Sequence, residues 1–91
     1  MNVIQSTSVE AAARYEDGSL DLVYIDADHA YEAVKADLKA WWPKVKPGGW
    51  IGGDDYTYHH RGVIQAVDEF FGYPTRISAR EWLALKPLTP H

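Results

Sequence analysis

The side chains in this sequence that are best suited to catalysis or metal binding belong to three aspartates and one histidine. Asp26 and His29 follow one apolar run, and Asp54 and Asp55 follow the next one along the chain. Three carboxylates held close together raise one another's pKa unless a cation neutralises them. A hard divalent ion with oxygen ligands, such as Mg²⁺, is the natural partner of such a set. Beside that ion, His29 can act as a general base near neutral pH.

The same residues also have an ordinary structural interpretation. Asp28 can cap the helix that follows it, and Asp26 can simply face water. Asp54 or Asp55 can cap the turn after its strand, and a single histidine is more often a surface or capping residue than a ligand. Spacing alone leaves the metal site and the structural interpretation open.

The apolar pattern predicts the elements that would position these residues. Residues 20–25 form a strand, and the uninterrupted apolar run 22–25 is typical of a strand that is buried on both faces of a parallel sheet. Apolar side chains at helical spacing predict a helix over residues 30–45, in which Pro43 should distort the last turn. Residues 46–49 end that helix, and residues 50–53 form a short strand whose glycines allow close approach to the backbone.

The remaining segments continue this alternation. Residues 3–5 can end a strand, helices are predicted over residues 9–15 and 62–71, and two last strands over residues 76–78 and 82–85. This order predicts an α/β fold with a parallel part in its sheet. Ligands of such sheets bind beyond the carboxyl ends of the parallel strands, so both acidic segments are expected at one rim.

Length, charge and composition exclude several classes of protein. The chain has 91 residues, which make one small domain at most. Its net charge of -4 and its scattered basic residues argue against a nucleic-acid partner. Without cysteine there is neither a disulfide framework nor thiolate chemistry. No apolar run approaches the roughly 18 residues of a membrane helix, and no signal peptide is recognised, so we expect a cytoplasmic protein without a membrane partner.

Two separated motifs resemble the second half of class I S-adenosylmethionine-dependent O-methyltransferases of the metal-assisted type. The first motif covers residues 22–32, and the second combines residues 46–49 with residues 53–56. The sequence is most similar to macrocin and mycinamicin sugar O-methyltransferases, and more distantly to catechol and caffeoyl-coenzyme A O-methyltransferases. The likeness covers about residues 3–86, and several positions outside the motifs also fit it: Asp37, Leu38, Trp41, residues 61–63, residues 66–68 and Trp82.

The resemblance implies a divalent metal ion, Mg²⁺ or similar, with three aspartate ligands. Asp26 matches the first ligand, and Asp54 and Asp55 match the second and third. The catechol-type enzymes have an asparagine at the last position, so Asp55 is a variation on the pattern. The ion of such enzymes binds the hydroxyl group of a small-molecule acceptor, lowers its pKa and fixes its orientation.

The resemblance also implies a base and a contact to the methyl donor, S-adenosylmethionine. His29 falls where the sugar enzymes have a catalytic histidine and the catechol-type enzymes a catalytic lysine. It would accept the proton of the acceptor hydroxyl, whose oxygen then attacks the sulfonium methyl group in line. Thr7 and Ser8 fall near the turn that contacts the adenine of the donor in this family.

One part of the family pattern is missing from these residues. The glycine-rich loop that follows the first strand of the family cradles the methionine part of the donor, and no strand, loop and helix of that kind precede Val3. The glycines at 48–49 and 52–53 lie in a different connection. We therefore expect residues 1–91 to form a single truncated methyltransferase-like domain that is not catalytically competent alone. Its fold would be a partial Rossmann-like sheet of about four strands, parallel and antiparallel, with helices mainly on one face.

Two other functions are consistent with the sequence. The chain can be a non-catalytic α/β module that self-associates, or a subunit that completes a methyltransferase site with a separate chain carrying the complementary N-terminal half. Residues 22–25 and 50–51 are apolar on both sides, yet the predicted helices cover one face only. We expect a bare apolar face and an unpaired hydrophobic edge at residues 22–25, and hence a homo-oligomer joined through either.

Overall fold

A computed structural model of the chain describes residues 3–6, 9–25, 30–54, 56, 61–72, 75–76 and 80–88. Strands and helices alternate along these residues, as the sequence predicts. In chain order the elements are β1 (Val3–Ser6), α1 (Val9–Ala12), β2 (Leu20–Ile25), α2 (Tyr31–Trp41), the 3₁₀ turn η1 (Trp42–Lys44), β3 (Val45–Gly53), α3 (Arg61–Phe71), β4 (Thr75–Arg76) and β5 (Trp82–Leu85).

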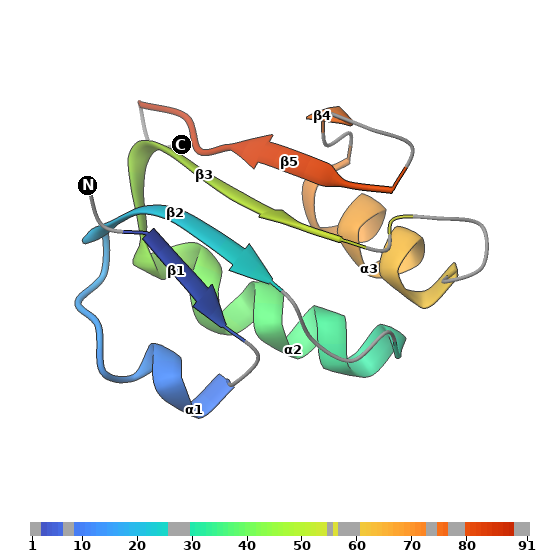
Figure 1. Cartoon of the computed structure of the whole chain (residues 1–91), viewed down its shortest axis with the longest axis horizontal. Coiled ribbons are helices and arrows are strands. Elements are labelled where there is room, and N and C mark those ends of the chain that lie inside the picture. The colour runs from blue at the N-terminus through green and yellow to red at the C-terminus, as the bar shows by residue number, and fades with distance from the viewer. Residues whose placement is uncertain are drawn as a thin grey trace.

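The described strands form one mixed sheet in the order β1-β2-β3-β5-β4. The first three strands are parallel to one another, and β5 is antiparallel to both of its neighbours. Figure 1 shows α1, α2 and α3 on the same face of this sheet. Right-handed crossovers between parallel strands that step in one direction lead to this arrangement. The α/β fold, the mixed sheet and the one-sided helices are therefore confirmed, with one strand more than the approximate number expected.

The hydrophobic core lies between the sheet and the helices. Val23 of β2 and Ile51 of β3 are fully buried beneath the helices, and both come from the continuous apolar runs of the sequence. Leu38 of α2 and Val67 of α3 are equally inaccessible to solvent. The helical positions that face the sheet recur at the spacing of one helix face. The buried members of this set are Val34, Leu38 and Trp41 on α2, and Val63, Ala66 and Val67 on α3.

The other face of the sheet carries a row of large apolar side chains. Val3 pairs with Leu22, Leu22 with Trp50, and Trp50 with Leu85, so these four residues cross four strands on one side. Val3, Trp50 and Leu85 are 50%, 37% and 51% exposed. No described helix covers this face, which we call the open face. The bare apolar face expected from the sequence is therefore present in the described part of the chain.

The edge strand expected at residues 22–25 is wrong. Strand β1 pairs with this part of β2 along its whole length, from Val3 opposite Leu22 to Ser6 opposite Ile25. An apolar strand with free backbone groups is a strong template for pairing, and the short apolar segment before α1 satisfies it. The outer strands of the described sheet are β1 and β4, which have 4 and 2 residues.

The boundaries around α2 also differ from those expected. The helix begins at Tyr31 with Ala30 as its N-cap and no side-chain cap hydrogen bond from that residue. Asp28, which the sequence offered as a cap, lies outside the described residues. It ends at Trp41, where Pro43 enforces the 3₁₀ turn η1, in agreement with the expected distortion. Strand β3 then starts at Val45, although the sequence predicted a turn over residues 46–49 and a strand from residue 50.

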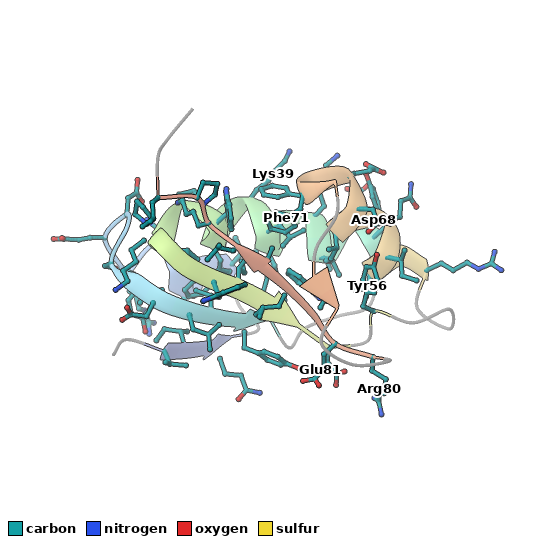
Figure 2. The ribbon with its side chains drawn as sticks, turned by 90° about the horizontal axis from the view of Figure 1, so that it is seen from above. Lys39, Tyr56, Asp68, Phe71, Arg80 and Glu81 are labelled. Atoms are coloured by element: carbon teal, nitrogen blue, oxygen red, sulfur yellow. The ribbon has the colours of Figure 1, made fainter. Side chains whose placement is uncertain are left out.

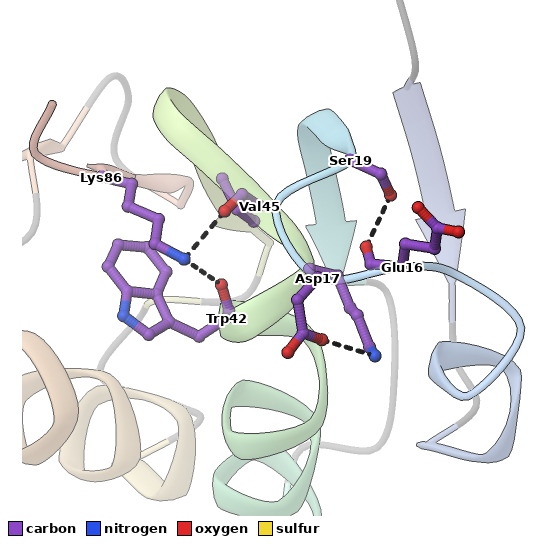
Figure 3. Close-up of polar contacts among 7 residues, drawn as sticks. Glu16, Asp17, Ser19, Trp42, Val45 and Lys86 are labelled. Carbon is purple, nitrogen blue, oxygen red and sulfur yellow. Dashed lines mark hydrogen bonds and ion pairs between the residues drawn. The ribbon is translucent and has the colours of Figure 1, made fainter. Parts of the chain in front are cut away.

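Lys86 explains why the chain is already extended at Val45. Its ammonium nitrogen Nζ donates to the carbonyl oxygens of Trp42 and Val45, at 2.9 and 2.8 Å (Figure 3). Its backbone N–H donates to Gly49 and its carbonyl accepts from Gly48, both at 2.8 Å. Gly48 has a φ of +85°, which only glycine adopts without strain. Burial lowers the pKa of Lys86. This contact between residues far apart in sequence joins the end of η1 to the end of β5.

The other elements lie close to their predicted positions. Helix α1 ends at Ala12 instead of residue 15, α3 starts one residue earlier than expected, and β5 has the predicted bounds. Strand β4 covers Thr75–Arg76 and so begins one residue earlier than expected, while residues 77–78 lie outside the described residues. Within the residues that the structure describes, no helix is both long and apolar enough to cross a membrane. The cytoplasmic location stays a prediction.

Asp37 should make the stability of this fold depend on pH. It lies on the core side of α2, only 4% exposed, and burial raises its pKa to about 6 from 3.8. Because the folded chain binds this proton more tightly than the unfolded chain, the group's contribution to stability is full below about pH 4 and is lost as the pH rises through 6. We expect Asp37→Asn to raise the free energy of unfolding at pH 8 by roughly 2–3 kcal/mol, and to change it little at pH 4.

Urea denaturation followed by circular dichroism at both pH values measures this difference. Glu32→Gln, on the exposed side of the same helix, is the matched control and should have little effect at either pH. A less stable Asp37→Asn variant at pH 8 would instead mean that the carboxylate is held by a donor that asparagine cannot replace.

Candidate functional site

The two central parallel strands end side by side, at the place where the sequence predicts a site. Ile25, the last residue of β2, is paired with Gly53, the last residue of β3. The sequence continues from these residues with Asp26 and with Asp54. Of the six candidate site residues, Asp54 is described. The other five lie outside the described residues: Thr7, Ser8, Asp26, His29 and Asp55.

Asp54 presents its carboxylate to solvent and to a positive charge. Its side chain is 36% exposed, and its Oδ2 lies 3.8 Å from Nη2 of Arg80, whose side chain is 65% exposed. An ion pair this open to water contributes little to stability. It does place a positive charge beside the Asp54 carboxylate. Among the described residues, no three side chains of the metal-ligating types gather in one place. The three-aspartate metal site therefore stays a prediction.

The backbone of Gly53 is enclosed so tightly that there is no room for a side chain. The position of Asp54, the next residue, is therefore fixed on this side. A Cβ atom on Gly53 would lie 2.7 Å from Nε1 of Trp82 and 2.9 Å from the carbonyl oxygen of Ile25. A Cβ atom on Gly52 would lie 2.8 Å from the carbonyl oxygen of Trp82. The expectation that these glycines admit close neighbours is confirmed, and the neighbour is the buried Trp82 of β5.

The segment that leads into β5 contacts the ends of the parallel strands. The backbone N–H of Tyr56 donates to the carbonyl oxygen of Arg80 at 2.7 Å. The hydroxyl group of Tyr24, on β2, donates to Oε2 of Glu81 at 3.4 Å. Figure 2 shows Arg80 and Glu81 next to each other at this end of the sheet. Residues 80–81 therefore connect the end of β2 with the segment after β3.

Helix α3 contacts the same region through two tyrosine hydroxyl groups. Tyr56 donates to Oδ1 of Asp68 at 2.5 Å in a partly buried contact. Tyr31, the first residue of α2, donates to Oε1 of Glu69 at 2.6 Å in an exposed one. This second hydrogen bond raises the pKa of Tyr31 and lowers that of Glu69. Successive carboxylates on α3 thus hold the residues that follow β3 and those that begin α2.

Three residues of this region were not predicted from the sequence: Tyr56, Asp68 and Arg80. Tyr56 and Asp68 lie in segments that carry the family resemblance, and this was the signal that could have drawn attention to them. Arg80 has no such signal, because it is one of nine basic residues spread over the chain. Its relation to Asp54 depends on how β5 folds back along β3.

A surface hollow of about 390 Å³ lies away from this region. Its lining comes from the first half of β2 and β3, and Asp21 forms an ion pair with Lys46 within it. Trp50 of the open face forms part of the wall. Because parallel strands begin at one end of a sheet and finish at the other, this hollow lies far from Asp54 and does not belong to the candidate site.

The sequence matches a known family over more than half of its length. The profile of the family described as "Methyltransferase domain" matches residues 1–56, a range that includes all six candidate site residues. A curated relative, the "Uncharacterized protein y4gI" of Sinorhizobium fredii, is 42% identical over 45 residues. That stretch is 50% of this chain and 5% of the relative, so the chain spans a small part of that protein.

Solved structures share the fold over most of this chain. A Corynebacterium glutamicum protein has a TM-score of 0.70 and 19% identity, over 94% of this chain and 47% of its own. The O-methyltransferase NovP has a TM-score of 0.65 and 24% identity, over 77% and 31%. CalS11, a TDP-rhamnose 3'-O-methyltransferase of calicheamicin biosynthesis, has a TM-score of 0.58 and 22% identity, over 71% and 31%. The chain spans less than half of each of these proteins.

Proposed function

We propose that this chain, which belongs to the methyltransferase-domain family, has one specific part in catalysis. It forms the metal- and acceptor-binding part of an S-adenosylmethionine-dependent O-methyltransferase. The observation that carries the proposal is the pairing of Ile25 with Gly53, after which the sequence continues with the candidate aspartates of both strands. Ligands of α/β sheets bind at this end of the parallel strands. The motifs that resemble metal-assisted O-methyltransferases include these two strand ends.

A divalent cation is the cofactor that fits the residues present. Three carboxylates on adjacent strand ends, Asp26, Asp54 and Asp55, provide the oxygen ligands that Mg²⁺ prefers. Asp54, whose side chain is 36% exposed, presents one of these carboxylates to solvent, where the guanidinium of Arg80 competes for it. When bound, the ion lowers the pKa of the acceptor hydroxyl group and holds its oxygen in place.

The residues of the chain then have distinct roles in methyl transfer. His29 accepts the proton of the acceptor hydroxyl, and Thr7 and Ser8 contact the adenine of the donor. A bond forms between the acceptor oxygen and the methyl carbon as the bond between that carbon and the sulfonium sulfur breaks, which leaves S-adenosylhomocysteine. A small molecule with a sugar-like hydroxyl group is the acceptor class we propose, in keeping with the motif resemblance and with the named activity of CalS11.

We propose that the 91 residues are not competent for this reaction by themselves. They correspond to 47% of one matched chain and 31% of two others, and they contain no glycine-rich loop after a first strand. We propose that a complementary N-terminal half, in the same protein or in a separate chain, supplies the cradle for the methionine part of the donor.

Divalent cations should bind this chain weakly through Asp54. We expect Mg²⁺ or Mn²⁺ to bind with a dissociation constant on the order of 1 mM, as is typical of open carboxylate sites. Asp54→Ala should abolish the binding because one ligand is lost. Isothermal titration calorimetry of both proteins gives the answer.

Two further variants sharpen the cation experiment. Asp17→Asn, in an exposed pair with Lys44 far from the rim, is the matched control and should bind as the wild type does. Arg80→Gln should bind more tightly, because it removes the positive charge that competes for Asp54. Identical heats from the wild type and Asp54→Ala would eliminate the metal site.

S-adenosylmethionine should bind the isolated chain poorly or not at all. The contacts proposed for Thr7 and Ser8 involve the adenine alone, and the methionine part of the donor has no cradle here. Equilibrium dialysis with labelled donor tests this. Donor concentrations up to about 1 mM are sufficient, because weaker binding would be of little use to an enzyme. A micromolar dissociation constant would contradict the proposed division of the domain.

Self-association is a second candidate function, and the open face favours it. A sheet face of this kind can bury on the order of 600 Å² of apolar surface per chain, which is worth roughly 15 kcal/mol before the cost of association is subtracted. Trp50 lies at the centre of the apolar row. A second copy that packs on this face would cover Trp50 in both protomers.

Light scattering at micromolar concentration should therefore detect a homodimer or a larger oligomer. Trp50→Lys should return the chain to a monomer, because it introduces a charge in the middle of the apolar row. Val9→Lys is the matched control, since Val9 is also a large exposed apolar residue, 45% accessible, but it belongs to α1 on the other side of the sheet. A stable monomeric wild type would refute association through the open face.

A further inference from the structure

Tyr56, which follows β3, is held at two points: its backbone N–H and its side-chain hydroxyl group. Its backbone N–H donates to the carbonyl oxygen of Arg80 at 2.7 Å, and its hydroxyl group donates to Oδ1 of Asp68 at 2.5 Å. Figure 2 shows Tyr56 directed toward α3, where Asp68 lies. The aromatic ring also packs against the buried core. Tyr56 therefore connects the chain just after Asp54 to both β5 and α3.

The contact with Asp68 is the stronger of these two restraints. A hydroxyl group that donates to a carboxylate at this distance forms a short, charge-assisted hydrogen bond. The contact is partly buried, so water competes with it less than at an exposed site. Asp68 itself cannot shift freely, because the neighbouring Ala66 and Val67 are buried against the sheet. The position of Tyr56 is thus set by the hydrophobic core through α3.

We infer that Tyr56 and Asp68 are positioning residues that fix the acidic segment after β3 for cation binding, an inference that rests on the proposed function. Gly53, immediately before Asp54, is fixed by Trp82, and Tyr56, shortly after Asp54, is fixed by Asp68. Ligands of a metal ion must be held to within about 0.5 Å of their productive positions. Loss of the hydroxyl contact leaves Tyr56 held by its backbone hydrogen bond and its ring packing alone, which loosens the chain next to Asp54 and weakens ion binding.

The chain contains a matched pair for comparison. Tyr31 and Glu69 form the same kind of hydrogen bond, at 2.6 Å and to the next residue of α3. That contact is exposed and joins α3 to the start of α2, not to the segment after β3. Tyr31→Phe therefore removes the same chemical group from the same helix without releasing the residues next to Asp54.

The experiment compares the Mn²⁺ affinities of the full chain and its variants by calorimetry, at a temperature where circular dichroism shows each of them folded. Tyr56→Phe should weaken Mn²⁺ binding about tenfold, as expected for a lost hydrogen bond to a charged group. Tyr31→Phe should stay within about twofold of the wild type. Asp68→Ala should match Tyr56→Phe, the double variant should be no weaker than either, and Asp68→Asn, which keeps an acceptor oxygen, should recover part of the affinity.

The outcomes separate this inference from the proposed function. A wild-type chain that binds Mn²⁺ and a Tyr56→Phe chain that binds it equally well would overturn the positioning role and leave the metal site in place. Equal losses in Tyr31→Phe and Tyr56→Phe would also overturn it, because they would indicate a general effect of loosening α3. A wild-type chain without Mn²⁺ affinity would refute both the metal site and the inference.

Discussion

The contact between Gly53 and Trp82 is the constraint on which this end of the molecule depends. The indole of Trp82 is 1% exposed and leaves no space for a Cβ atom on Gly53, while the carbonyl oxygen of Ile25 closes the position from the other side. Three strands thus meet at one glycine, immediately before Asp54. A side chain at this point would separate β3 from β2 or from β5. The residues that follow β2 and β3 would then no longer start from neighbouring positions.

The helices hold this contact in place from below the sheet. Phe71 of α3 packs on the ring of Trp82, with 5.8 Å between ring centroids, and Trp42 packs edge-on to Phe71 at 4.9 Å. The same Trp42 accepts a hydrogen bond from Lys86 and lies beneath its ammonium group. The aromatic cluster therefore joins η1, α3 and β5 in one unit. Because α3 belongs to that unit, its carboxylates can serve as fixed points for Tyr31 and Tyr56.

Local patterns predicted the central part of this fold, and contacts between distant residues decided the rest. The continuous apolar run 22–25 identified a buried parallel strand, and helical spacing identified α2 and α3. The start of β3 at Val45 was missed because it depends on Lys86, 41 residues further along. The pairing of β1 with β2 was missed because a short apolar segment does not reveal its neighbour. Within the candidate site, the strand ends followed from the sequence, whereas the Arg80 contact with Asp54 required the fold.

The two faces of the sheet make different demands on the same strands. One face is filled by the helices and fixes where β2 and β3 end, while the other keeps Val3, Trp50 and Leu85 accessible in a row that begins on the outer strand β1. On the proposed function, the missing donor cradle must come from polypeptide outside these residues. Such polypeptide would approach the sheet from an outer strand, β1 or β4, or from the open face, since the helices occupy the remaining face. Polypeptide that packs on the open face would cover the apolar row and complete the donor site in one assembly step, in which hydrophobic burial supplies the free energy and the strand ends supply the chemistry.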